Sequence, residues 1–182
     1  WAQRHPERLT ALIRALYRAS QWCELPANHA ELVKLLAEPR YIGAPAEILL
    51  RGLSNRLTLV RGDAPQAVSD FYVPSRHAAT FPWTSHALWF YSQMVRWRQM
   101  VYSPEHLPLV RATYRPDLYR LALASLGVNL PTHDAKIEGA RTRRQAIDAV
   151  GGALDYGPDG FFDNRSFDPE NLSEYLTQLG PS

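Results

Sequence analysis

Apolar residues recur at helical spacing along most of the chain. Residues 6–24 show the clearest pattern, because Leu9, Ile13 and Leu16 share one face and Pro6 suits a first helical turn. Similar patterns, bounded by proline and glycine, predict further helices near residues 28–37, 44–52, 83–100, 104–112, 116–126 and 169–179. We therefore expect a mainly helical structure with little strand. Large side chains that we expect to be buried are Trp22, Phe90, Met94, Trp97, Leu118 and Leu121.

Residues 53–81 lack a clear helical period. Leu57 and Leu59 alternate with polar residues, and so do Phe71 and Val73 further along. Alternation of this kind is typical of half-buried strands, and a Gly-Asp pair between the two runs can form a turn. The pattern therefore permits two short strands in this region.

Long runs of apolar residues at helical spacing become rare after residue 128. Residues 129–166 hold seven Gly or Pro, so we expect an extended, loop-rich segment with at most one helical turn, near residues 143–149. On this basis the chain divides into a helical part, residues 1–128, and an extended return segment with a C-terminal helix, residues 129–182.

The last segment combines turn-forming residues with aromatic ones. Phe161, Phe162 and Phe167 have no helical partners of their own, and we expect them to anchor the tail to the rest of the molecule. Asp168 is a good N-cap residue, so we expect its carboxylate to accept from a backbone amide two or three residues further on. Leucine and tyrosine side chains should then line one face of a short final helix.

Composition limits the possible classes of protein. The formal net charge of +2 is too small to suggest nucleic-acid binding, and Cys23 stands alone, so no internal disulfide is possible. No apolar run reaches the roughly 18 residues that a membrane-spanning helix needs. Because the chain opens at Trp1, directly before a strong helix, we interpret it as part of a longer protein.

The sequence offers no recognisable metal site. The histidines are His5, His29, His77, His86, His106 and His133, and no two of them stand four residues apart on a helix. A calcium loop that starts at Asp155 fails, because Gly157 stands where a ligand is required and Ser166 where the bidentate acid belongs. We therefore expect neither a metal nor a cofactor.

Two further patterns are weak as functional sites. Ser85 and His86 are adjacent residues near a helix start and point in different directions, so they do not make a catalytic dyad, and a structural histidine is the better interpretation. The basic run RTRRQ at residues 141–145 lacks interleaved aromatic residues and is more typical of a solvated loop. No pattern indicates an enzyme.

Several ordered blocks resemble the C-terminal half of one family of solute-binding proteins. The blocks are QWCELPANHAEL at 21–32, FPWTSHALWF at 81–90, YRPDLYRLALASLG at 114–127 and GFFDNRSFDPENLSEYL at 160–176. Together they are similar to the nitrate/nitrite- and bicarbonate-binding proteins of ABC importers and to the related nitrate sensors. Blocks in a fixed order are much more specific than any one of them.

The resemblance implies a mainly α-helical fragment of an α/β protein, the C-terminal part of a type-II periplasmic-binding-protein fold. Two lobes would close around a small oxyanion, with most pocket residues outside this chain. The family uses a basic residue close to the start of the first helix, for which Arg4 and His5 are the candidates. The partner would be a membrane permease for a periplasmic or membrane-anchored transport component, or an antiterminator-type protein for a cytoplasmic sensor. The alternatives are a bicarbonate or alkylsulfonate ligand, or a helical protein-interaction domain without its own ligand.

Overall fold

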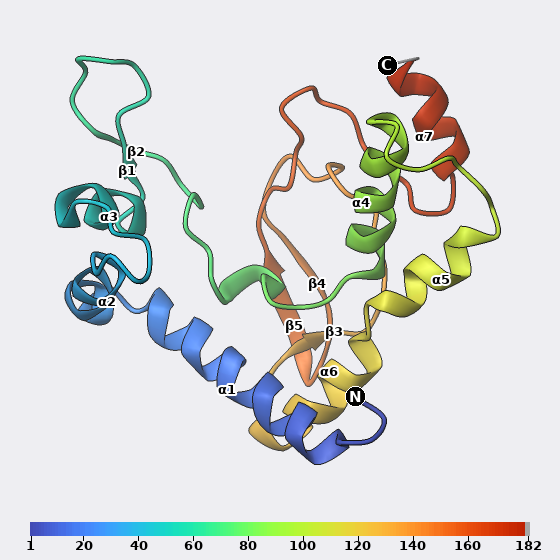
Figure 1. Cartoon of the computed structure of the whole chain (residues 1–182), viewed down its shortest axis with the longest axis horizontal. Coiled ribbons are helices and arrows are strands. Elements are labelled where there is room, and N and C mark those ends of the chain that lie inside the picture. The colour runs from blue at the N-terminus through green and yellow to red at the C-terminus, as the bar shows by residue number, and fades with distance from the viewer. Residues whose placement is uncertain (181–182) are drawn as a thin grey trace. The chain divides into compact units, whose positions relative to one another are not determined.

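Helices dominate the computed structural model of the chain, which describes residues 1–180 (Figure 1). They are α1 Pro6–Glu24, α2 His29–Leu36, α3 Ala46–Leu53, α4 Thr84–Arg96, α5 His106–Thr113, α6 Pro116–Leu123 and α7 Leu172–Leu179. Short 3₁₀ turns lie at Pro26–Asn28, Arg76–Ala78 and Ala124–Leu126. A helix is present at each of the seven predicted places, because the apolar period and the proline starts indicate them correctly. None of the helices formed by the described residues has the length and apolar character that a bilayer crossing requires.

The chain forms two compact units. One contains residues 1–13 together with the chain from Phe81 onward, and the other contains Arg14–Thr80. The division falls inside α1 and just after the turn at Arg76–Ala78. Neither boundary lies at residue 128. The division of the chain into a helical part, 1–128, and a return segment, 129–182, remains a prediction.

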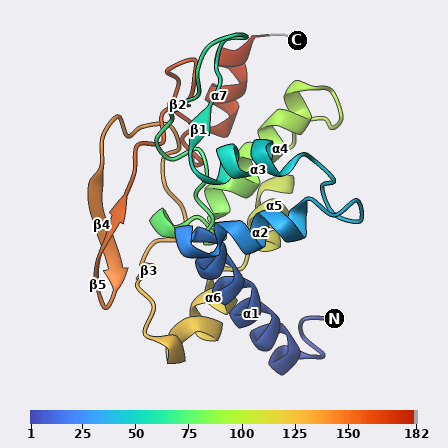
Figure 2. The ribbon, with the colours of Figure 1, turned by 90° about the vertical axis from the view of Figure 1, so that its left-hand side faces the viewer.

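The unit of residues 14–80 has its own small core. Leu32 and Val33 of α2 pack with Leu53 of α3, and the partly buried Trp22 lies against them. Figure 2 shows α2 and α3 side by side. The expected burial of Trp22 is therefore only partial in this structure.

A two-stranded antiparallel hairpin follows α3. Its strands are β1 Arg56–Leu57 and β2 Gln66–Ala67. The second strand thus lies earlier than the predicted one near 71–73. The reason is a side-chain contact: the Asn55 carboxamide oxygen accepts from the Tyr72 backbone N–H at 2.7 Å, which holds that segment as a loop.

The core of the other unit lies where α4, α5 and α7 meet. Leu88 and Tyr91 of α4 pack against Phe167, Leu172 and Tyr175 from the end of the chain. Phe167 is completely buried, and its ring meets the Tyr175 ring edge-on at a centroid distance of 4.9 Å. The expected aromatic anchor at this position is confirmed.

One face of α4 is buried and the other is exposed. The buried face carries Leu88 and Tyr91, whereas Phe90, Met94 and Trp97 are 53%, 39% and 62% exposed. The prediction that these three side chains are buried is wrong, because the apolar residues of α4 form two separate stripes. The helix also ends earlier than expected, at Arg96. Likewise Leu121 on α6 is 69% exposed and Leu118 is only partly buried.

Residues 129–166 contain a sheet that the sequence interpretation missed. Strands β3 Leu130–Pro131, β4 Gln145–Val150 and β5 Gly152–Tyr156 form an antiparallel sheet in the order β3-β4-β5. Figures 1 and 2 show the β4–β5 hairpin beside β3. The helical turn expected near 143–149 is therefore wrong. Gly151 has a φ of 93°, a conformation that suits glycine, and it closes a turn tight enough for this hairpin.

The C-terminal motif only partly follows the prediction. Phe161 is partly buried beside Trp89, but Phe162 is 101% exposed and is not an anchor. Turn formers surround Phe162, so its backbone position turns the ring outward. The Asp168 carboxylate does accept from the Glu170 N–H at 3.0 Å, as expected. Because α7 begins only at Leu172, this contact closes a turn before the helix and is not its N-cap.

Candidate functional site

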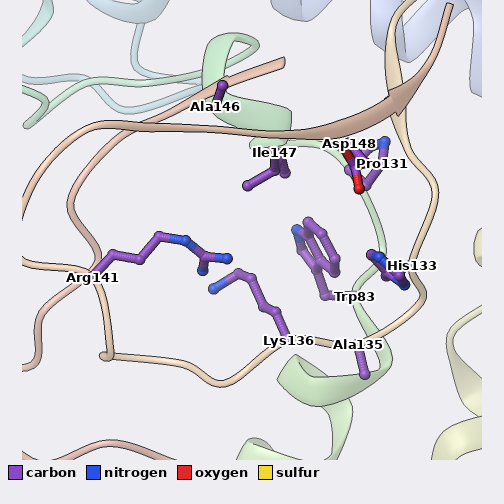
Figure 3. Close-up of a pocket in the computed structure, with 9 residues that line it drawn as sticks. All are labelled: Trp83, Pro131, His133, Ala135, Lys136, Arg141, Ala146, Ile147 and Asp148. Carbon is purple, nitrogen blue, oxygen red and sulfur yellow. The ribbon is translucent and has the colours of Figure 1, made fainter. Parts of the chain in front are cut away.

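A cavity of about 250 Å³ lies beside β4 within the unit that contains α4 (Figure 3). Its lining residues are Trp83, Pro131, His133, Ala135, Lys136, Arg141, Ala146, Ile147 and Asp148. They come from the residue before α4, the strands β3 and β4, and the loop between these strands. Cationic, aromatic and apolar side chains thus line one cavity that is partly open to solvent.

The loop that carries His133, Ala135 and Lys136 is tied to two helices. Arg120 of α6 donates to the backbone oxygens of Pro131 at 2.7 Å and His133 at 2.9 Å. At the start of α4, the backbone N–H of Thr84 donates to the Asp134 oxygen at 2.8 Å, and the Thr84 hydroxyl donates to the same oxygen at 3.0 Å. These bonds hold one wall of the cavity in place.

A buried ionic network lies next to the cavity. Lys136 pairs with Glu138 and donates to Asp159 at 2.8 Å, and the side chains of Lys136 and Glu138 are only 6% and 7% exposed. Glu138 also accepts from the Ser85 hydroxyl at 2.6 Å and lies 3.4 Å from His86 Nε2. The Lys136 ammonium lies over the Tyr156 ring, 5.0 Å from its centroid. Burial on this scale requires the charges to be paired.

The network sets the protonation of its members. Burial alone would lower the pKa of Lys136, but the charges of Glu138 and Tyr156 and the hydrogen bonds to Asp159 and Glu138 together outweigh this effect and raise the pKa above its ordinary value. Burial alone would raise the pKa of Glu138, but its hydrogen bond with His86 and the charge of Lys136 hold the pKa below the usual glutamate value. Burial raises the pKa of Tyr156. Lys136 and Glu138 are therefore both charged at neutral pH.

Ser85 and His86 meet in space through a carboxylate. The hydroxyl of Ser85 and Nε2 of His86 both approach the same Glu138 oxygen. In a catalytic triad the imidazole lies between the hydroxyl and the acid, whereas here the carboxylate lies between the other two groups. The arrangement is that of a buried structural acid. No spacing in the sequence connects Glu138 with these two residues, so the contact could not be found there.

Arg141 departs from the solvated loop that the sequence predicts for the basic run. Its backbone N–H donates to Asp159 Oδ1 at 2.8 Å, and its guanidinium lies over the Tyr156 ring at 5.1 Å. Arg143 and Arg144 are exposed, as expected for a solvated loop. The structure therefore separates Arg141, which lines the cavity, from its two neighbours.

Arg4 and His5 lie apart from this cavity, in the turn before α1. Arg4 is exposed, and its guanidinium has no hydrogen-bond or ion-pair partner among residues 1–180. The His5 ring lies 5.5 Å from the Trp1 ring and is partly buried. A second cavity, of about 210 Å³, lies between the first turns of α1 and α6, but neither residue lines it. Their part in ligand binding remains a prediction.

The described residues hold no cluster of three or more His, Cys, Asp or Glu side chains that could bind a metal ion. The acidic side chains that do gather around Lys136 are paired with basic and hydroxyl groups. No set of metal ligands can therefore be placed among residues 1–180.

Two curated proteins and a solved structure are similar to the chain over 98% of its length. The nitrate/nitrite binding protein NrtA of Synechococcus elongatus is 30% identical over 184 residues, and the chain covers 36% of it. The bicarbonate-binding protein CmpA of the same organism is 26% identical over 190 residues, and the chain covers 38% of it. No protein-family model matches the chain.

The solved structure is the periplasmic nitrate-binding protein NrtA from Synechocystis PCC 6803. It superposes with a TM-score of 0.76 at 23% sequence identity, and the chain covers 42% of it. The predicted fold class is confirmed: the chain has the fold of part of a periplasmic binding protein. The chain spans little more than a third of the curated relatives named above. Both relatives are named as binding proteins and not as enzymes.

Proposed function

We propose that the chain is part of a solute-binding protein that recognises a small oxyanion, nitrate or nitrite. The observation that carries the proposal is similarity along 98% of the chain to a nitrate/nitrite-binding protein at 30% identity. The shared fold agrees with it, since the superposed structure is that of a nitrate-binding protein. The order of the sequence blocks that resemble this family adds a third line of support.

The recognition of nitrate sets clear physical requirements. Nitrate is a flat, weakly hydrated monoanion, so its pocket needs several hydrogen-bond donors and one full positive charge. Arg4 can supply that charge, because its guanidinium is exposed and has no partner among the described residues. His5, next to it, can supply a ring N–H. We assign these two residues to the ligand, and the other donors to parts of the protein outside this chain.

Binding would be reported by closure of two lobes around the anion. A ligand that contacts both lobes favours the closed state, and a partner protein can then distinguish the closed from the open form. In an importer the partner is the membrane permease of an ABC system. In a sensor it is an antiterminator-type regulatory protein. A secretory or lipoprotein signal at the start of the full-length gene product would mark a transport component, and its absence a sensor.

Bicarbonate is the second candidate ligand. The chain is 26% identical to a bicarbonate-binding protein, only slightly less than to the nitrate/nitrite-binding one. Bicarbonate is also a flat monoanion, but it carries a proton that can be donated to an acceptor in the pocket. An alkylsulfonate would instead require an apolar extension of the pocket. A helical interaction domain without its own ligand is the remaining alternative.

The test is calorimetric titration of the protein that contains this chain together with the remaining length of its relatives. Nitrate, nitrite, bicarbonate and an alkylsulfonate are added separately at constant ionic strength and pH. We expect saturable heat with nitrate or nitrite and much weaker heat with the other two. Heat only with bicarbonate or the alkylsulfonate would refute the assignment, and heat with none of them would favour the interaction domain.

A further inference from the structure

The indole N–H of Trp83 has no hydrogen-bond partner among residues 1–180. Trp83 is 2% exposed, its Nε1 atom is buried without a partner among the described residues, and its ring lines the cavity beside β4. A buried donor that is left unsatisfied is costly, and such groups usually meet an ordered water molecule or a ligand. We therefore expect a hydrogen-bond acceptor, from a water molecule or a ligand, next to this indole N–H.

Two further donors face the same space. Figure 3 shows the Arg141 guanidinium and the Lys136 ammonium close together, with the indole nitrogen of Trp83 on the opposite side of the space. Arg141 meets Asp159 only at 3.5 Å, so most of its five N–H groups lack a partner of standard hydrogen-bond length. Trp83 and Arg141 thus place donors on two facing sides of the cavity (Figure 3).

The opposite end of the cavity is lined by an acidic side chain and a histidine. Asp148 and His133 lie on the other side of the Trp83 ring from Arg141 (Figure 3). Pro131, Ala135 and Ile147 supply apolar parts of the wall. The volume of about 250 Å³ is much larger than a four-atom anion requires, and the acid at the far end disfavours a second negative charge.

We infer that this cavity binds a small organic monocarboxylate. Its carboxylate accepts hydrogen bonds from Trp83 Nε1 and the Arg141 guanidinium, with Lys136 nearby, and its short hydrocarbon chain lies against Ile147 and Ala135. The site is separate from the oxyanion pocket of the proposed function, and its ligand is of another class. Because Glu138 and Asp159 already balance the two cations, hydrogen bonds rather than net charge hold the ligand, and we expect weak binding, with a Kd on the order of millimolar.

The experiment follows the indole N–H signals of the 182-residue chain by ¹H–¹⁵N NMR. The chain has five tryptophans, and the Trp83→Phe variant assigns the signal of Trp83. Sodium acetate, propionate and butyrate are the probes, with sodium nitrate and sodium succinate as comparison anions at constant ionic strength. We expect a saturable shift of the Trp83 signal with propionate or butyrate and weaker binding of nitrate and succinate. No saturable shift with any carboxylate, or tighter binding of nitrate or succinate, would overturn the inference.

A matched pair of arginine variants tests the donors. Arg141→Gln should weaken carboxylate binding by about tenfold or more, the loss expected for one charged hydrogen bond, whereas Arg143→Gln, in the same loop but exposed, should leave it unchanged. Ala135→Leu keeps every donor but fills part of the cavity and should also weaken binding. Equal binding by both arginine variants would overturn the inference. If Arg141→Gln does not fold, the Ala135→Leu variant provides the test. Carboxylate binding that is as strong in Ala135→Leu as in the unchanged protein would also overturn the inference.

This titration is independent of the nitrate experiment. It reads one indole signal in the 182-residue chain, whereas the proposed function is tested by heat from the longer protein. Nitrate binding to the longer protein without a carboxylate effect on Trp83 would refute the second site alone. A carboxylate effect without nitrate binding would refute the proposed function alone.

Discussion

Lys136 and Glu138 form an ion pair in the interior of the protein, two residues apart in the sequence and each less than a tenth exposed. Asp159 completes the arrangement by accepting from the same ammonium at 2.8 Å. Buried charges are tolerated only with their partners, and the contact of Lys136 with Asp159 links the loop before β4 to the segment after β5. The stability of that unit should therefore depend on both charges.

Replacing Lys136 by Met should destabilise the protein strongly. The substitution leaves the carboxylates of Glu138 and Asp159 buried without their shared cation, and the loss of one partner of a buried pair costs about 3–5 kcal/mol. Urea denaturation measures the change in the free energy of unfolding. Lys34→Met is the matched control, since Lys34 is exposed on α2 and should change little. A loss for Lys136→Met no larger than that for Lys34→Met would contradict the structural role of the pair.

Stability should decline at both extremes of pH. The pKa of Glu138 lies below its ordinary value of 4.5, so its contribution is present above that pH and is lost as the pH falls through the lower pKa of the folded state. The pKa of Lys136 lies above 10.5, so its contribution is present below that pH and is lost as the pH rises through the raised pKa. Urea denaturation across this range checks both limbs.

Two variants distinguish the contributions of Glu138 and Lys136 to the pH dependence of stability from those of the other titratable groups. Glu138→Gln should flatten the acid limb, because the residue with the lowered pKa is gone. Tyr156→Phe should remove part of the alkaline limb, since burial raises the pKa of Tyr156 and its stabilisation is likewise lost as the pH rises. Limbs of unchanged size in both variants would show that other groups control the pH dependence.

The aromatic residues at the end of the chain offer a sharp comparison. Phe167 is 0% exposed and packs on Tyr175, so Phe167→Ala should cost about 3–5 kcal/mol of stability. Phe162 is fully exposed, and Phe162→Ala should cost almost nothing. Thermal melting of both variants under one set of conditions decides it. Similar melting temperatures for the two variants would contradict the packing described for this segment.

Much of the helical structure is predictable from sequence because its signals are local. Pro6 and Pro116 stand at helix starts, and Gly127 ends the turn after α6 with a φ of 62°. Burial is less predictable. The apolar residues of α4 fit a helix in any case, but whether Phe90 faces a core depends on which elements pack on that side, and this is not encoded in the helix itself.

The missed sheet has a different explanation. Strand β4 pairs with β3, whose residue Leu130 lies opposite Val150, a contact between positions twenty residues apart. The hairpin itself did carry a local signal, since the Gly151-Gly152 dipeptide is typical of a hairpin turn. Counting these glycines only as loop formers led to the wrong prediction. The Lys136–Glu138 network and the Trp83 cavity depend on this sheet, so they could not be found from sequence.

Arg4 provides a specific test of the assigned ligand residues. In the protein with the remaining length of its relatives, Arg4→Ala should weaken nitrate binding by at least about tenfold, because the anion loses a charge-assisted hydrogen bond. Arg8→Ala, four residues further on and also exposed, should bind nitrate normally. Calorimetric titration compares the two dissociation constants. Equal affinities would remove Arg4 from the pocket and leave His5 as the candidate to be tested in the same way.

Nitrate titration of the longer protein, beside that of the 182-residue chain, tests the central claim most directly. A pocket built from two lobes cannot be completed by one segment, so we expect saturable one-to-one heat from the longer protein and none from this chain alone. Heat from the longer protein with bicarbonate or an alkylsulfonate, but none with nitrate or nitrite, would contradict the claim. Nitrate binding of equal affinity by the 182-residue chain would instead place the whole pocket inside it.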